Sequence, residues 1–267
     1  MSWTERFEYT QWYPSANQPG SQRGKPNVLI RVSTMMNVYT GTSGFSYKEW
    51  KGAFYPEKIA NSSMLRYYAE RLPAVEINST FYRLPKPEAL ASWADEVPEG
   101  FRFVLKASRR ITHFKRLKDA EDVTAYLLST AASLGPKLGP ILFQLPPNFA
   151  KDAVRLQSFL ALLPGGRRAA FEFRHASWRD VEVEKILSDN NVAWCVADTG
   201  EDPAVLIRTA DWGYLRLRRP DYSEEGLSDW AAQIRAQAWA DCFVFFKHED
   251  EGAGPKMACR FLEMFGD

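Results

Sequence analysis

Short apolar runs recur along this chain, and polar side chains lie at or near the ends of most of them. The runs are rich in β-branched and aromatic residues, and stretches with helical patterning lie between most of them. Strands that alternate with helices predict a parallel sheet. The eight expected strands are 38–43, 74–79, 101–108, 140–146, 168–174, 192–198, 212–218 and 242–248.

The intervals between these runs predict helices of ordinary length. The expected helices are 62–71, 86–96, 121–134, 151–163, 180–189, 224–239 and 255–265. Ser62 has the side chain of an N-cap, and Pro87 suits a first helical turn. The sixth connection, 199–211, is short and predicts only a weak helix. Eight units in about 230 residues predict an α/β fold, a single (β/α)8 TIM-type barrel with its active site at the C-terminal strand ends.

Residues 1–37 do not share this pattern. Prolines and glycines lie among polar residues there, which predicts a disordered N-terminal extension before a barrel domain over 38–267. In a second interpretation, translation starts at Met35 or Met36, because Val38 opens the first strand almost at once.

Composition narrows the class of protein. The chain has 267 residues, 45% of them hydrophobic, and a net charge of +1, so no global basic field favours nucleic acid or a membrane as partner. The three cysteines have no paired spacing, which favours a reducing cytoplasm over a disulfide framework. No run approaches the roughly 20 apolar residues that span a bilayer, and no secretory signal is present. We therefore expect a cytoplasmic protein.

Several strands carry polar residues two positions apart. Side chains alternate along a strand, so Glu172 and Arg174 share one face while the opposite face is apolar. The outward face must pack beneath helices, and the polar set should therefore point into the barrel, toward its C-terminal mouth. The inward set is expected to include Glu76, Asn78, Lys106, Ser108, Gln144, Asp198, Arg216, Arg218, Lys247 and Glu249. Internal salt bridges that merely fill the barrel are the alternative, but the size of the set favours a functional pocket.

The charge of this set predicts its ligand. The expected positive side chains are Lys106, Arg174, Arg216, Arg218 and Lys247, and the negative ones are Glu76, Glu172 and Asp198. Five positive charges and three negative charges give +2, and arginine suits phosphate and carboxylate groups. We expect an enzyme for a small anionic or sugar-like ligand. Its catalytic residues would be Glu172, Glu76, Lys106 and Asp198, with the carboxylates as acid or base. A glycosidase with paired catalytic carboxylates is a narrower form of this enzyme hypothesis. It is not favoured, because Glu76 and Glu172 lie on strands two and five, which are well apart around the barrel.

No metal or other cofactor is expected. His113, His175 and His248 each follow a strand and could join Glu172, Asp198 or Glu249 at a divalent ion, but their spacing is not that of a ligand set. Two other functions remain open. The basic segment 108–118, with aromatics nearby, predicts a nucleic-acid-processing or single-strand-binding module, and a non-catalytic scaffold is the third hypothesis.

Ordered sequence blocks connect the chain to a known family. They include YTGTSGFSYKEWKGAFYP (39–56), VEINSTFYRLP (75–85), FEFRHASW (171–178) and WGYLRLRRPDY (212–222). Over 38–267 the chain resembles the DUF72 (YecE-like) family of uncharacterised bacterial and archaeal proteins, which implies a TIM-type barrel but no settled activity. The motif residues that the resemblance implies are Ser43, Tyr47, Glu76, Asn78, Thr80, Tyr82, Lys106, His113, Gln144, Glu172, Arg174, Trp178 and Asp198.

Strands seven and eight depart from the family pattern. Arg218 and Arg219 stand where many members have His-Gly, and Lys247-His248-Glu249 replaces an Asn-Asn-Asp-like end. The substrate-facing half at these strands is therefore expected to differ. Together with the charge argument, the resemblance gives the expected substrate-binding residues: Ser43, Tyr47, Asn78, Thr80, Tyr82, His113, Gln144, Arg174, Trp178, Arg216 and Lys247.

Overall fold

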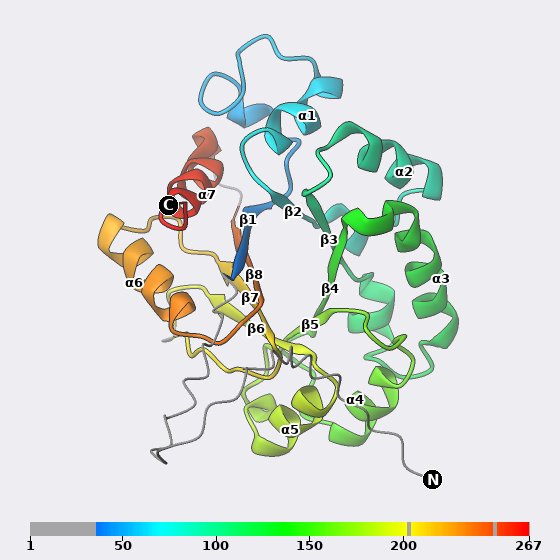
Figure 1. Cartoon of the computed structure of the whole chain (residues 1–267). Coiled ribbons are helices and arrows are strands. Elements are labelled where there is room, and N and C mark those ends of the chain that lie inside the picture. The colour runs from blue at the N-terminus through cyan, green and yellow to red at the C-terminus, as the bar shows by residue number, and fades with distance from the viewer. Residues whose placement is uncertain (1–35, 202–203, 248–249, 267) are drawn as a thin grey trace, which may run out of the picture. The chain divides into compact units, whose positions relative to one another are not determined.

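The computed structural model describes residues 36–201, 204–247 and 250–266. Within them, eight parallel strands pair in chain order, and β1 also pairs with β8, which closes the barrel (Figure 1). The strands are β1 (Asn37–Ser43), β2 (Ala74–Ile77), β3 (Arg102–Lys106), β4 (Leu138–Gln144), β5 (Ala169–Glu172), β6 (Ala193–Asp198), β7 (Trp212–Leu217) and β8 (Asp241–Phe246). The expected (β/α)8 barrel is confirmed, and each expected strand is present.

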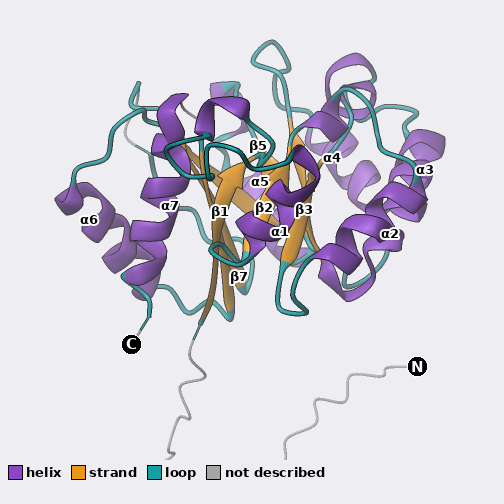
Figure 2. Cartoon of the chain, turned by 90° about the horizontal axis from the view of Figure 1, so that it is seen from above, coloured by secondary structure: helices purple, strands orange, loops and turns teal. Residues whose placement is uncertain are grey.

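Helices lie outside the strands in both views of the chain (Figures 1 and 2). They are α1 (Met64–Ala69), α2 (Pro87–Glu96), α3 (Glu121–Ala131), α4 (Ala153–Leu160), α5 (Val181–Asp189), α6 (Glu224–Arg235) and α7 (Ala253–Glu263). Asp152, Asp180 and Ser223 cap helices by accepting hydrogen bonds from main-chain N–H groups. In the described parts of the β6–β7 connection, 199–201 and 204–211, no helix forms.

Two sequence predictions need correction or fall outside the description. Ser62 is not an N-cap, because it lies within the 3-10 turn Asn61–Ser63 that precedes α1. The expected extension, 1–37, lies outside the described residues except for its last two, and Asn37 already belongs to β1. In the part of the chain that is described, no helix is long and apolar enough to cross a membrane.

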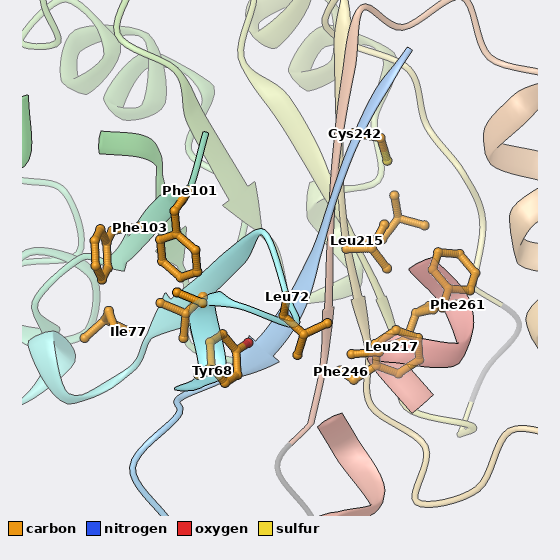
Figure 3. Close-up of a cluster of buried hydrophobic side chains, with 14 of the residues drawn as sticks. Tyr68, Leu72, Ile77, Phe101, Phe103, Leu215, Leu217, Cys242, Phe246 and Phe261 are labelled. Carbon is orange, nitrogen blue, oxygen red and sulfur yellow. The ribbon is translucent and has the colours of Figure 1, made fainter. Parts of the chain in front are cut away.

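The outward strand faces pack against the helices. Leu217 of β7 and Phe246 of β8 lie in one apolar cluster with Phe261 of α7, and Tyr68 of α1 packs in a T-shaped contact with Phe101 (Figure 3). Leu217 and Phe246 alternate with inward-facing residues of their strands, such as Arg216 and Phe245, as two-residue periodicity requires. The inward faces are thereby left to line the interior of the barrel.

Apolar side chains fill much of that interior. They include Val104, Leu142, Trp212, Tyr214, Phe243 and Phe245. All of them are at most 1% exposed. Polar side chains on the same strand faces lie two or four positions further along the chain, at the carboxyl ends of the strands. The charged groups at the barrel mouth therefore rest on an apolar plug, which removes water from one side of them.

Gly41 on β1 is required by the approach of β2. A Cβ at this position would lie 1.9 Å from the Ala74 carbonyl oxygen. Because the two backbones are paired there, we expect Gly41→Ala to cost about 3 kcal/mol by overpacking and to lower the melting temperature by roughly 5 °C or more. At Gly165 an added Cβ meets no atom within 4 Å, so Gly165→Ala should have the same melting temperature as wild type. Equal melting temperatures for the two variants would contradict this account.

Candidate functional site

The polar groups at the barrel mouth converge because their strands are in register. Ser43 of β1 lies beside Glu76 of β2, and Gln144 of β4 lies beside Glu172 of β5. Arg216 of β7 is on the inward face with Tyr214, between outward-facing Leu215 and Leu217. The expectation that the polar positions of these strands face inward is confirmed for Glu76, Gln144, Glu172 and Arg216, and Ser43 joins them through its hydrogen bond to Glu76.

An arginine held between two carboxylates forms the centre of the site. Arg216 Nη2 donates to Glu76 Oε1 at 2.8 Å, and Nη1 donates to Glu172 Oε2 at 2.5 Å. The three residues are at most 3% exposed. Although strands two and five lie well apart around the barrel, Arg216 connects their carboxylates. Three buried charges with direct partners form a rigid unit, since breaking any pair leaves an uncompensated charge.

Glu76 is saturated with hydrogen bonds from four side chains. Its Oε1 accepts from Ser43 Oγ at 2.9 Å and Asn78 Nδ2 at 3.1 Å, besides Arg216. Its Oε2 accepts from the hydroxyl of Tyr214 at 2.6 Å. Tyr214 was absent from the sequence-based candidates. Two-residue alternation from Arg216 was the available signal, but a tyrosine in an apolar run also fits simple core packing.

Glu172 has a similar set of donors. Its Oε1 accepts from Gln144 Nε2 at 2.7 Å and from Arg174 Nε at 3.0 Å. Burial is the largest single influence on both carboxyls and raises their pKa, but the charge of Arg216 together with the other side-chain donors outweighs it. The net result lowers the pKa of Glu76 and, with help from Arg174, lowers the pKa of Glu172 to about 2. From sequence, the expected role of these carboxylates was acid or base. Neither residue carries a proton to donate at neutral pH, which argues against the acid role, and their hydrogen bonds favour an anchoring role.

Lys106 is the titratable group whose environment suits proton transfer. Its ammonium donates to Gln144 Oε1 at 2.9 Å and lies 4.3 Å from the ring centre of Phe81. Burial, followed by the positive charge of Arg216, lowers the pKa of Lys106 to about 8. Burial and the cations Lys106 and Arg174 also lower the pKa of His113. Lys106 therefore exchanges protons more readily near neutral pH than an ordinary lysine, whereas the lowered pKa of His113 favours the neutral imidazole there.

Arg218 adds to the positive field at the mouth. Burial, followed by the neighbouring guanidinium of Arg216, lowers the pKa of Arg218. No carboxylate of the described residues forms an ion pair with it. Arg174 reaches Glu172 with one nitrogen but remains 42% exposed, so part of its fork is open to a ligand.

Asp198 does not belong to this set, and its predicted inward position is wrong. It shares the outward face of β6 with Trp194 and Val196, whereas Ala193 and Cys195 face the interior. Its carboxylate accepts hydrogen bonds from Arg219, Tyr222 and Trp230. Without Asp198 the formal sum changes from +2 to +3 for the described residues, with Lys106, Arg174, Arg216, Arg218 and Lys247 against Glu76 and Glu172.

Three other predicted residues occupy supporting or peripheral places. Trp178 is fully buried between Phe149 and Phe173, and its indole N–H donates to the Phe149 carbonyl. The buried Thr80 hydroxyl lies 2.7 Å from the carbonyl oxygen of Lys106 and so joins the loop after β2 to the end of β3. Tyr82 is 69% exposed on the outer surface. None of the three lines the charged centre.

Other predicted residues lie at the rim. Tyr47 donates to the Ser43 carbonyl at 2.8 Å, and half-buried Lys247 follows β8. The metal hypothesis involved His248 and Glu249, which lie outside the described residues. Among those that are described, no three His, Cys, Asp or Glu side chains are close enough together to hold a metal ion.

Comparison with known proteins places this barrel in a family. The family model described as "Protein of unknown function DUF72" matches residues 39–267. The chain belongs to the DUF72 family. It is 25% identical to the UPF0759 protein YunF of Bacillus subtilis over 85% of this chain and 94% of that protein. It is 32% identical to the UPF0759 protein YecE of Escherichia coli K12 over 139 residues, which span 52% of this chain and about half, 48%, of that relative.

Solved DUF72 structures share the fold. A DUF72 protein from Thermotoga maritima superimposes with a TM-score of 0.75 at 26% identity, covering 86% of this chain and 100% of the other. One from Enterococcus faecalis gives a TM-score of 0.70 at 19% identity over 87% and 96%. The resemblance expected from sequence is confirmed, and so is the barrel it implies.

Removing Arg216 should destabilise this DUF72 barrel in a pH-dependent way. Arg216→Met leaves two buried carboxylates without their main partner, at a cost of about 3–5 kcal/mol. In wild type, the lowered pKa of Glu172 gives a stability contribution that is present above about pH 4.5 and lost toward pH 2. In the variant, burial raises both carboxyl pKa values, so stability should instead fall as pH rises from about 4.5 to 8.

Urea unfolding midpoints measured across this pH range test the inversion. The variant that also carries Glu76→Gln and Glu172→Gln lacks both carboxylates that face position 216, and its midpoint should recover and lose the added pH dependence. A flat profile for Arg216→Met alone would contradict the assigned role of the arginine.

Proposed function

We propose that the mouth of this DUF72 barrel binds a small phosphorylated or carboxylated metabolite, and that the protein is an enzyme that uses Lys106 for proton transfer. The observation that carries the proposal is an excess of positively charged side chains that are partly buried and therefore poorly hydrated. Lys106, His113 and Arg218 all have lowered pKa values, and burial is the largest cause for each. A bound anion would favour the charged form of all three.

The available donors suit an oxyanion. Arg218 has no ion pair among the described residues, and Arg174 uses its Nε for Glu172 while the side chain stays partly exposed. Guanidinium forks bind phosphate and carboxylate oxygens through paired N–H groups. Arg216 is already committed to Glu76 and Glu172, so it fixes the field and leaves direct anion contact to its neighbours.

Lys106 is the group best placed for acid–base work. General acid–base catalysis is most effective when the pKa of the catalyst lies near the working pH, and the pKa of about 8 at Lys106 meets that condition. Gln144 orients its ammonium, and Thr80 holds the main chain of the same residue. The reaction classes that such a proton donor serves are lyase, isomerase and hydrolase chemistry on an anionic substrate.

A thermal-shift panel of inorganic phosphate, citrate, ribose 5-phosphate and glucose 6-phosphate tests anion binding. A ligand at about 100 times its Kd should raise the melting temperature by roughly 5 °C or more. Arg218→Gln should abolish that shift without lowering the melting temperature of the unliganded protein, because burial disfavours the cation it removes. Arg66→Gln, at an exposed position on α1, should respond like wild type. A shift that survives in Arg218→Gln, or no shift with any anion, contradicts the proposal.

The titration of Lys106 provides a second test. After reductive methylation with 13C-formaldehyde, the NMR signal that is missing in Lys106→Arg should titrate near pH 8. Saturation with the best anion from the panel should move that midpoint upward, because a nearby negative charge stabilises the ammonium. A midpoint near the ordinary lysine value of about 10.4, or one that the anion leaves unchanged, would exclude Lys106 from the anion site.

A further inference from the structure

Aromatic side chains are exposed together on one part of the described surface. Tyr82, Phe114 and Tyr126 are 69%, 68% and 59% exposed. They belong to the connections that follow β2 and β3 and to α3. The other large apolar side chains with high exposure in the described chain are valines. Exposed rings concentrated in one place mark a surface that contacts another molecule.

A groove of about 1130 Å³ runs past two of these rings. Tyr82, Arg83 and Lys86 line it from the connection between β2 and α2, while Arg110 and Tyr126 line it from the connection after β3 and from α3. Ser79 and Ser108, which come just after β2 and β3, also line it. The groove therefore lies next to the carboxyl ends of these strands, on the outer side of the loops whose Phe81 and His113 rings meet near Lys106.

Cations are interleaved with the rings. Arg83, Lys86 and Arg110 line the groove against one carboxylate, Glu88. Arg109 lies over both Tyr82 and Phe114, with distances of 5.4 and 5.3 Å to the ring centres. None of these four cations forms an ion pair with a residue in the described part of the chain. The groove thus offers an excess of positive charge next to flat apolar surfaces.

The basic segment 108–118 is not a loose solvated loop. Arg110–Phe114 form a π-helical turn, and Ile111 and Thr112 within it are fully buried. Leu117 is 4% exposed, has a left-handed φ of 67°, and donates its N–H to the Ile111 carbonyl. Backbone held in such conformations by burial presents its outward side chains in fixed places, which reduces the entropy lost on binding.

We propose that this groove binds single-stranded nucleic acid. Phosphates would pair with Arg83, Lys86 and Arg110, and unpaired bases would stack on Tyr82 and Tyr126. Stacking on aromatic rings beside a cationic track is how single strands are held without sequence preference. An acidic peptide would satisfy the cations but leave the rings without flat partners, and a duplex hides its bases. The groove residues are separate from Arg218 and Lys106, so this proposal does not depend on the small-anion site.

Fluorescence anisotropy of the full chain with a labelled oligothymidylate of about 12 nucleotides tests the proposal. Affinity should fall steeply with salt, and Arg110→Gln should reduce the slope of log K against log salt by about 0.7 for the lost phosphate contact. Tyr82→Ala and Tyr126→Ala should each weaken binding about tenfold while leaving the melting temperature unchanged, because both rings are exposed. Val181→Ala, on exposed α5 surface, is the control that should bind like wild type.

An abasic oligonucleotide of the same length separates stacking from charge. It keeps the phosphates, so Tyr82→Ala should weaken the thymidine strand but leave the abasic strand unchanged. Equal losses for both strands would refute base stacking. If poly-glutamate binds as tightly as oligothymidylate, the groove is a peptide site and the proposal is overturned. If Arg218→Gln abolishes oligothymidylate binding and Tyr82→Ala leaves it intact, the nucleic acid binds at the barrel mouth and the proposal is likewise overturned. Absence of oligonucleotide binding at low salt would reject it outright.

Discussion

The buried guanidinium of Arg216 determines how the other polar side chains of the barrel mouth are paired. It is 1% exposed, and a charge without water needs direct partners to avoid a penalty of several kcal/mol. Glu76 and Glu172 supply them, but two buried carboxylates then need donors of their own. Those donors are Ser43, Asn78, Tyr214, Gln144 and Arg174. Lys106 is hydrogen-bonded to Gln144. The need of these buried charges for partners therefore connects the carboxyl ends of six strands, β1, β2, β3, β4, β5 and β7.

The same unit decides which groups are available for chemistry. Arg216 and the other donors lower the pKa of both carboxyls, so the geometry favours a role for them as anchors. Among the described residues, their two negative charges do not offset the four cations that act on them, Lys106, Arg174, Arg216 and Arg218. The excess positive charge is carried by side chains that are partly desolvated above the apolar plug, mainly Lys106 and Arg218. In the proposed function, proton transfer and anion binding therefore belong to the basic residues and not to the acidic ones.

The connections after β2 and β3 present two different faces. Toward the barrel axis, the Phe81 and His113 rings pack together beside the Lys106 ammonium. On the outer side, Tyr82 and Arg110 line the large groove. Thr80 and Leu117 fix these connections from within, through a hydrogen bond to the end of β3 and through burial. The two proposed binding surfaces can thus share one rigid support without sharing a residue.

The sequence by itself determined the strands and most of the inward positions, because two-residue alternation distinguishes apolar from polar faces at Glu76, Lys106, Gln144, Glu172 and Arg216. It could not assign the face of Asp198: in VAWCVAD both faces are apolar until the last residue, so either could point inward. Only the tertiary structure showed that Trp178 packs inside the helical layer. It alone also set the proton affinities, because these depend on short distances between residues such as Glu76 and Arg216, which are 140 positions apart in the chain.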